Sequence, residues 1–297
     1  MLLNYITWDV SPFIYEGEHF AIGWYGTLWV LGLIGLLATL LLTFKHDKVP
    51  IQYAYITFMV TLVCVLFFGH LFQGLFYEWY YAPSNPVHFL GTDWYYRNYY
   101  FEHPWKFLDF AHGGFASHGV ILGAIVSGVV VSKIIPQVRW WIIDKIMLGI
   151  LWIGVAVRMA NLINVEICGT ITTLPWGFVF LGNDYALHPT QIYELLSYVL
   201  AIGFGWCLYL CKRTNKYNGL ISAVMITTIM LLRIVIEFVK QPQMHIEAEW
   251  SLYMGQWLSI PFAIWAIWWI FISIEQEKTA PITSNRKKNH TYPKRRQ

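Results

Sequence analysis

Charged residues are scarce in this chain of 297 residues, because Asp, Glu, Lys and Arg make up only 12% of it, against roughly 25% in soluble domains. Cysteine is scarce too, and Cys64, Cys168, Cys207 and Cys211 form neither a CxxC pair nor a metal-ligand spacing. A disulfide scaffold is therefore excluded, and thiols that behave as small apolar residues are expected. The net charge of +3 is also too small for the basic footprint of a nucleic-acid-binding protein.

Apolar residues are what the chain has in abundance, since 57% of it is hydrophobic and 18% is aromatic. A soluble protein of this size needs more charge to cover its surface, and a disordered chain has fewer apolar residues. The composition therefore excludes a cytosolic globular enzyme and a disordered chain. It indicates a membrane protein that crosses the bilayer several times.

Seven stretches are apolar enough to cross roughly 30 Å of hydrocarbon, which takes about 20 helical residues. They are residues 21–44, 51–77, 113–132, 140–158, 191–211, 218–239 and 252–274. Residues 1–20 lack a basic segment, because the first Lys is Lys45. We therefore expect no cleavable signal peptide, and we expect the first span to direct insertion. The fold class is all-α integral membrane.

The basic residues predict the orientation of the spans. With seven spans, 15 of the 20 Lys and Arg residues fall on one side of the membrane, in the links after spans one, three and five and in the C-terminal tail. Positive charges favour the cytoplasmic side, so the N-terminus is expected outside and the C-terminus inside. Residues 1–275 are predicted to form one membrane-embedded domain, and 276–297 a basic cytoplasmic tail.

Aromatic residues crowd the outer link between spans two and three, residues 78–112. They are Trp79, Tyr80, Tyr81, Trp94, Tyr95, Tyr96, Tyr99, Tyr100 and Trp105. Such side chains favour the headgroup region of a bilayer. This aromatic arm is therefore expected to lie along the outer membrane surface.

Polar side chains inside the predicted spans gather at one depth. An ionisable residue within a span is costly and indicates a functional site by default. On the topology above, the outer ends of six spans carry Tyr25, His118, Arg158, Asn161, Asn164, Glu166, His188, Gln191, Glu194, Arg233, Glu237 and Gln256. The forked donors of two arginines suit a phosphate group, and a nearby histidine adds a candidate base. The pattern predicts a site near the outer lipid headgroups.

Each of these residues also has a structural interpretation. Arg158 and Glu166 can be interfacial anchors. Arg233 and Glu237 are four residues apart on one helix face and can simply neutralise each other. His118 can pack between helices, and the step from His188 to Pro189 can be a helix entry. Their convergence at one depth favours the functional interpretation.

The motifs that carry these residues resemble those of one family. They are Trp24-Tyr25-Gly26, Phe115-Ala116-Ser117-His118-Gly119, the stretch from Arg158 through Asn161 and Glu166 to Gly169, His188-Pro189-Thr190-Gln191-Ile192-Tyr193-Glu194, Arg233-Ile234-Val235-Ile236-Glu237-Phe238 and Met254-Gly255-Gln256. In order and spacing they are similar to the signature of bacterial phosphatidylglycerol–prolipoprotein diacylglyceryl transferases. The resemblance covers about residues 20 to 265, and six motifs in order make it specific.

The resemblance implies an activity in the bacterial cytoplasmic membrane. The diacylglyceryl group of phosphatidylglycerol moves to the lipobox cysteine thiol of a prolipoprotein signal peptide, a thioether forms, and glycerol phosphate leaves. No metal or organic cofactor is implied.

The resemblance also implies roles for residues. The implied catalytic residues are His118 as the base, Arg158 and Arg233 on the phosphate, Glu237 holding Arg233, and Tyr25 donating to the headgroup. The implied substrate-binding residues are Asn161, Glu166, Gly169, His188 and Gln191.

The chain departs from the family pattern at four positions. Val157, Ala160 and Val120 stand where glycine is common, which suggests altered helix packing. His70 stands where an arginine is usual, which removes one possible contact to the lipid phosphate.

Two other classes of protein share some of these sequence features. A transporter needs polar residues toward the cytoplasmic side, where the spans show little besides Asp144 and Lys145. An inactive lipid- or peptide-binding relative of the same fold is the nearer alternative.

Overall fold

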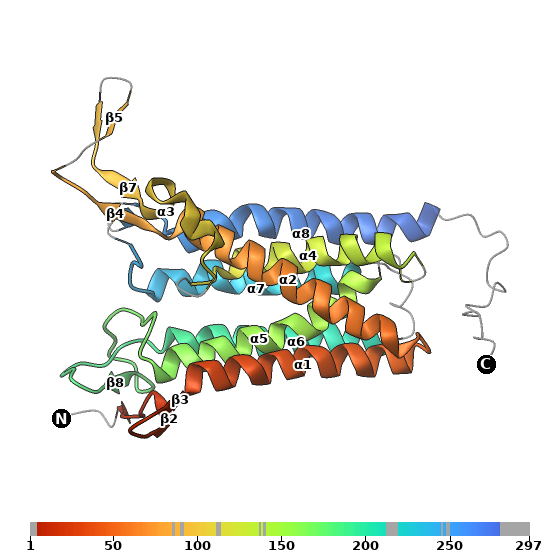
Figure 1. The fold of residues 1–297 in the computed structure, drawn as a ribbon, viewed down its shortest axis with the longest axis horizontal. Helices are drawn as coiled ribbons and strands as arrows, with labels where there is room; N and C mark the ends of the chain where they lie inside the picture. The colour runs from red at the N-terminus through yellow and green to blue at the C-terminus, as the bar shows by residue number, and fades with distance from the viewer. Residues whose placement is uncertain are drawn as a thin grey trace.

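A computed structural model describes residues 5–84, 87–89, 92–110, 114–136, 138, 141–211, 219–244, 246–247 and 250–279. Seven long helices lie side by side along the long axis of the molecule (Figure 1). They are α1 (Trp24–His46), α2 (Ile51–Phe76), α4 (Ser117–Ile134), α5 (Ile142–Ile163), α6 (Thr190–Leu210), α7 (Leu220–Ile236) and α8 (Met254–Thr279). Each is long and apolar enough to cross a membrane, α7 together with the 3₁₀ turn η2 (Glu237–Val239). The prediction of seven spans is confirmed.

Some helix ends differ from the predicted bounds by several residues. Helix α5 continues to Ile163 instead of ending at 158, so Arg158 and Asn161 project from its last turns. Helix α8 runs to Thr279, past the domain boundary predicted at 275. Residues 280–297, most of the predicted tail, lie outside the described residues, as do Lys212, Arg213 and Lys216.

Helix α5 is the centre of the bundle. It packs against α1, α4, α6 and α7, and 72% of its membrane window is buried, against 22% for α8. Its closest neighbour is α1, where a Cβ on Gly32 would come within 2.7 Å of the Ile153 Cα atom. A Cβ on Gly149 would likewise come within 2.7 Å of the Leu36 side chain. Small residues let transmembrane helices approach in this way, and here they fix α5 as the scaffold for the site.

Short strands cap one end of the bundle, which the all-α prediction did not anticipate. They are β1 (Ile6–Trp8), β2 (Phe13–Glu16), β3 (Ala21–Gly23), β4 (Trp79–Tyr81), β5 (Val87–Phe89), β6 (Thr92–Trp94), β7 (Tyr96–Asn98) and β8 (Phe178–Phe180). They pair two by two, with β1 and β8 parallel and the pairs β2/β3, β4/β7 and β5/β6 antiparallel. Links outside the spans are free to form such strands, while the spans satisfy their backbone groups within helices.

The aromatic arm is fastened to α2 by buried polar groups. The Asn98 side chain donates to the Gly74 carbonyl at 2.8 Å and caps the short helix α3 (Tyr99–Glu102). His70 is fully buried, and its Nε2 bonds the Lys106 carbonyl oxygen at 2.9 Å, in the 3₁₀ turn η1 (Pro104–Leu108). His70 thus anchors the arm, so its replacement of the usual arginine is a packing change in this chain. From there β4, β7 and β5 extend sideways beyond the bundle (Figure 1).

The opposite end of the bundle uses its charges for fastening. Asp144 accepts hydrogen bonds from the Gly219 amide at 2.9 Å and from both the amide and the hydroxyl of Ser222, so it caps the start of α7 from α5. Lys145 pairs with Asp47, and its Nζ lies 4.8 Å from the centre of the Tyr209 ring. Both residues that a transport path had to use are therefore engaged in helix packing.

Candidate active site

A cavity of about 270 Å³ opens among the helices at the end of the bundle that carries the strands. Six helices contribute to its wall, together with the loop after α5 and the segment after η2. The polar residues on the wall are Tyr25, Gln73, Tyr77, Ser117, Arg158, Asn161, Glu166, Tyr198, Arg233 and Gln243. Five of the polar residues predicted to gather at one end of the spans line this cavity, namely Tyr25, Arg158, Asn161, Glu166 and Arg233.

Arg158 is held on the cavity wall by two side chains, Glu194 and Asn161. Its Nε pairs with the Glu194 carboxylate, and its Nη1 donates to the Asn161 side chain at 3.0 Å. Asn161 in turn donates to Glu166 at 2.6 Å, and Asn164 donates to the other oxygen of Glu166 at 3.1 Å. Burial of the guanidinium beside a carboxylate fixes both its charge and its orientation. Asn161 therefore contacts Arg158 directly, and Glu166 is connected to Arg158 through Asn161.

Arg233 shares the same carboxylate. Its Nη1 lies 3.4 Å from Glu194 Oε1, and its side chain is only 6% exposed. The Nε and Nη1 atoms make no hydrogen bond within the described part of the chain. A buried N–H without a partner costs about 1–3 kcal/mol, so this guanidinium has unused capacity for an oxygen ligand. Burial raises the pKa of Tyr77, which lies against Arg233, to about 12, so a neutral phenol faces the cavity at neutral pH.

Arg233 and Glu237 do not form the expected direct ion pair within the described part of the chain. Glu237 keeps helical dihedral angles at the end of α7, and its amide donates to the Arg233 carbonyl oxygen, so the two residues still share a helix face. The Glu237 carboxylate instead lies 3.4 Å from Lys240 Nζ, three residues further along. Glu237 does not line the cavity, and it contributes to the site from behind the wall.

His118 lies outside the cavity wall. It is in the first turn of α4, fully buried, with its Nε2 2.9 Å from the Ser259 hydroxyl of α8 and its ring beside Phe262. Its Nδ1 has no hydrogen-bond partner among the residues that the structure describes. Its neighbour Ser117 is on the wall, so the imidazole is one residue removed from the cavity.

Gly169, His188 and Gln191 support the loop after α5 and lie off the cavity wall. Gln191 donates to the Glu166 carbonyl oxygen at 2.6 Å, and the Gly169 amide donates to the His188 carbonyl oxygen at 3.0 Å. A Cβ on Gly169 would meet His188 Cβ at 2.5 Å, so glycine is needed there. Burial lowers the pKa of His188, which keeps this imidazole neutral at neutral pH. These three residues position Glu166.

The loop that carries Glu166 is strained. Val165 and Ile167, on either side of it, both have φ of 56°, a left-handed conformation that β-branched residues rarely adopt. Such strain persists only where the surroundings enforce it, and it clusters at functional sites. The hydrogen bonds from Asn161, Asn164 and Gln191 supply that enforcement here.

Two residues central to the site were absent from the predicted set, Glu194 and Lys240. From sequence alone, Glu194 is one polar group among many in the outer half of the spans, and Lys240 is a charge in a loop. A charge count would have pointed to Glu194, because two buried arginines need more than one carboxylate. Lys240 gave no such signal, since its burial depends on a fold of the chain after α7.

Comparison with known proteins is consistent with this geometry. A family profile described as prolipoprotein diacylglyceryl transferase matches residues 12–272. The chain is 32% identical to the phosphatidylglycerol–prolipoprotein diacylglyceryl transferase of Chloroherpeton thalassium over 93% of this chain and 98% of that protein. It is also 32% identical to the enzyme of the same name from Porphyromonas gingivalis, over 94% and 98%. The one from Bacteroides fragilis is 29% identical over 91% and 96%.

Proposed function

The chain belongs to the prolipoprotein diacylglyceryl transferase family, and we propose that its cavity is where phosphatidylglycerol and the prolipoprotein thiol react. The enzyme transfers the diacylglyceryl group of phosphatidylglycerol to the lipobox cysteine of a prolipoprotein. The thiol sulfur forms a bond to the glyceryl carbon, the bond from that carbon to the phosphate oxygen breaks, and the thiol proton leaves. Glycerol phosphate departs with one more negative charge than the phosphodiester had.

One observation carries the assignment of the site, namely two buried guanidinium groups on the wall of one cavity, locked by a shared carboxylate. Charge develops on the phosphate as the carbon–oxygen bond breaks. Donors that are already oriented toward that charge need no rearrangement, so they stabilise the transition state more than the ground state. Arg158 and Arg233 are placed to do this, with Tyr25 and Tyr77 as neutral donors to the headgroup.

The decisive experiment uses the purified full chain in detergent with phosphatidylglycerol and a lipobox peptide. A thioether-linked diacylglyceryl peptide is expected by mass spectrometry, with glycerol phosphate released in equal amount. A peptide with serine in place of the lipobox cysteine is the matched control. Folded protein that binds lipid and peptide but forms no thioether would indicate the inactive relative instead.

The chain is a multi-pass membrane protein, and we assign it to the bacterial cytoplasmic membrane with the cavity toward the outer leaflet. The distribution of charge supports this orientation. Lys45, Lys48, Lys133 and Lys145 lie at the end of the bundle opposite the cavity, where α1, α4 and α5 begin or end. The substrate thiol and the lipid headgroup then meet on the outer side, beneath the aromatic arm.

Cysteine labelling tests the orientation. After replacement of the four native cysteines, single cysteines placed in residues 78–112 and near residue 286 are expected to react with an impermeant reagent from opposite sides of the membrane. The reason is the segregation of basic residues, which sets the topology during insertion. Labelling of both positions from the same side would refute the topology.

Substitution of His118 tests the proton acceptor. We expect His118→Gln to lower turnover by about 10²–10⁴-fold, the usual loss when a general base is removed. Because the ring is not on the wall in this structure, its use as a base requires the contact between α4 and α8 to open when substrate binds. The measurement is the pH profile of kcat/KM, in which the acid limb should disappear.

Ser259→Ala is the matched control, since it breaks the same hydrogen bond and leaves the imidazole in place. If both variants lose activity equally with unchanged pH profiles, His118 only packs α4 against α8. Suppose instead that folded His118→Gln keeps near wild-type turnover while Glu166→Gln loses most of its activity. That result would identify Glu166, which lines the cavity, as the group that accepts the thiol proton.

A further inference from the structure

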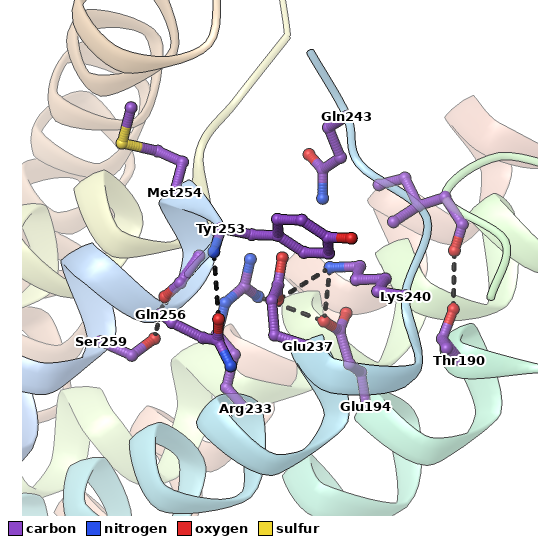
Figure 2. A network of polar contacts seen from close by, with 12 residues as sticks. Thr190, Glu194, Arg233, Glu237, Lys240, Gln243, Tyr253, Met254, Gln256 and Ser259 are labelled. Atoms are coloured by element: carbon purple, nitrogen blue, oxygen red, sulfur yellow. Dashed lines mark hydrogen bonds and ion pairs between the residues drawn. The ribbon is translucent and has the colours of Figure 1, made fainter. Parts of the chain in front are cut away.

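Lys240 lies fully buried behind the two arginines. Its Nζ is 3.0 Å from Glu194 Oε1 and 3.4 Å from Glu237 Oε2, and Figure 2 shows the ammonium group between these two carboxylates. Neither Lys240 nor its two partners contribute to the cavity wall. Burying an ammonium group costs free energy. A lysine in a loop would therefore extend into solvent unless other contacts held it in the interior.

The backbone enforces the location of Lys240. Its amide donates to the Glu237 carbonyl oxygen at 3.2 Å, and Lys240 forms an antiparallel bridge with Gly169. The neighbouring Gln241 amide donates to Cys168 at 3.2 Å. The strained loop that holds Glu166 and the segment that holds Lys240 are therefore one hydrogen-bonded unit. Backbone hydrogen bonds at Lys240 and at the next residue therefore fix where the Lys240 side chain starts.

The charges in this buried cluster do not cancel. Arg158, Arg233 and Lys240 bring three positive charges, and Glu194 and Glu237 bring two negative charges. Glu166 also lines the cavity, but its side chain is solvent-exposed and is connected to Arg158 only through Asn161, so water screens its charge from the cluster. About one positive charge is left over, and the groups that present it to the cavity are the arginines, since Lys240 is behind them.

The two oxygens of Glu194 are shared among three cations. Oε1 faces both Arg233 and Lys240, and Oε2 faces Arg158. Without Lys240 the carboxylates would equal the arginines in number, and the cluster would be neutral. With Lys240 present, Glu194 still orients both arginines, but the Lys240 ammonium group offsets part of its negative charge.

We propose that Lys240 is a positioning residue that leaves the arginine pair with one uncompensated positive charge, matched to a headgroup phosphodiester of one negative charge. This inference rests on the proposed function of the site. The inference also bears on which phospholipid binds. A zwitterionic headgroup carries a positive charge of its own, which the positively charged cavity wall would repel. Lys240 thereby favours an anionic phospholipid such as phosphatidylglycerol over a zwitterionic one such as phosphatidylethanolamine.

Two substitutions separate charge from shape. Lys240→Gln retains a hydrogen-bond donor to the carboxylates but removes the charge, and Lys240→Arg keeps the charge with a different shape. Lys133→Gln is the matched control, since it removes one exposed positive charge from the last turn of α4 at the far end of the bundle. Each form is assayed for KM and kcat with phosphatidylglycerol, and for product inhibition by glycerol phosphate.

In Lys240→Gln we expect KM and the inhibition constant of glycerol phosphate to rise about tenfold or more, since a tenfold change corresponds to about 1.4 kcal/mol, a modest charge interaction. The value of kcat should change much less, because the arginines remain. Lys240→Arg and Lys133→Gln should stay close to wild type. The rise in Tm that glycerol phosphate causes in each variant measures the same difference in binding without any turnover.

Several results would overturn the role of Lys240. Unchanged KM and inhibition constant in folded Lys240→Gln would do so, as would equal losses in the Gln and Arg variants, which would indicate packing. Should Lys240→Gln and Lys240→Met both fail to fold while Lys240→Arg folds, the charge is structural and the proposal fails. Absence of thioether product from the wild type is a separate result, which refutes the proposed function itself.

Discussion

Replacement of Arg233 by lysine is expected to lower kcat/KM for phosphatidylglycerol by about 10²–10³-fold, the loss measured when one preorganised donor to a developing oxyanion is removed. A lysine keeps the charge but not the planar fork that can grip two phosphate oxygens. The structure adds a reason specific to this position. Among the described residues, the Nε and Nη1 atoms of Arg233 have no hydrogen-bond partner, although Nη1 lies 3.4 Å from Glu194, and an ammonium at the end of a flexible stem cannot replace both donors.

The measurement is steady-state transfer to a lipobox peptide, with each form checked for folding in detergent. Arg97→Lys, a change of the same kind in strand β7 of the arm, is the matched control and should retain activity. Near wild-type kcat/KM in Arg233→Lys would remove Arg233 from phosphate binding and leave it as a structural partner of Glu194.

The location of Glu237 changes how a double substitution has to be interpreted. If Arg233 and Glu237 formed a direct ion pair, replacing both would delete that pair, which proteins often tolerate when apolar residues take its place. In the structure those two residues have different partners, so the double change leaves Lys240 with Glu194 alone. The single change to lysine is therefore the cleaner test of the phosphate role.

Replacement of Glu194 by glutamine is expected to destabilise the protein more than any other single change in the site. Glu194 is the shared partner of Arg158, Arg233 and Lys240, and all three would keep their charges in a buried space. Removal of one partner from a buried ion pair costs about 3–5 kcal/mol. At the scale of protein unfolding entropies this corresponds to a fall in apparent Tm on the order of 10 °C.

Thermal unfolding in detergent measures this effect, together with the yield of membrane-inserted protein. Glu16→Gln, the same chemical change on the exposed strand β2, should leave the Tm unchanged. A Glu194→Gln variant with the wild-type Tm would show that the three cations are balanced by other groups, and it would weaken the case for a shared carboxylate.

Local sequence was sufficient for the chain of contacts from Arg158 to Glu166. Arg158 and Asn161 are three residues apart on one helix, which places them on the same face. Glu166 follows within a few residues, so its distance from Asn161 is limited by the length of the chain. Contacts of this kind depend on spacing alone, and the structure contains them.

Spacing did not identify the ion-pair partner of Glu237. Glu237 keeps helical dihedral angles and stays on the face of Arg233, but its carboxylate pairs with Lys240, which the 3₁₀ turn after Ile236 brings alongside. His118 shows a different limit. Its residue number places it at the outer end of α4, but which side of the helix faces the cavity depends on how α4 packs against α2 and α8.

The sequence by itself determined the membrane class, the seven spans, the gathering of polar residues at one end of the spans and, through its motifs, the family. These follow from composition, from the length a helix needs to cross a bilayer and from the order of short motifs along the chain. Only the tertiary structure decided that one carboxylate, Glu194, serves three cations, that Lys240 is buried, and that His70 holds the arm. The reason is that each of these contacts joins residues from different elements, and their distances are set by how the helices rotate and pack against each other.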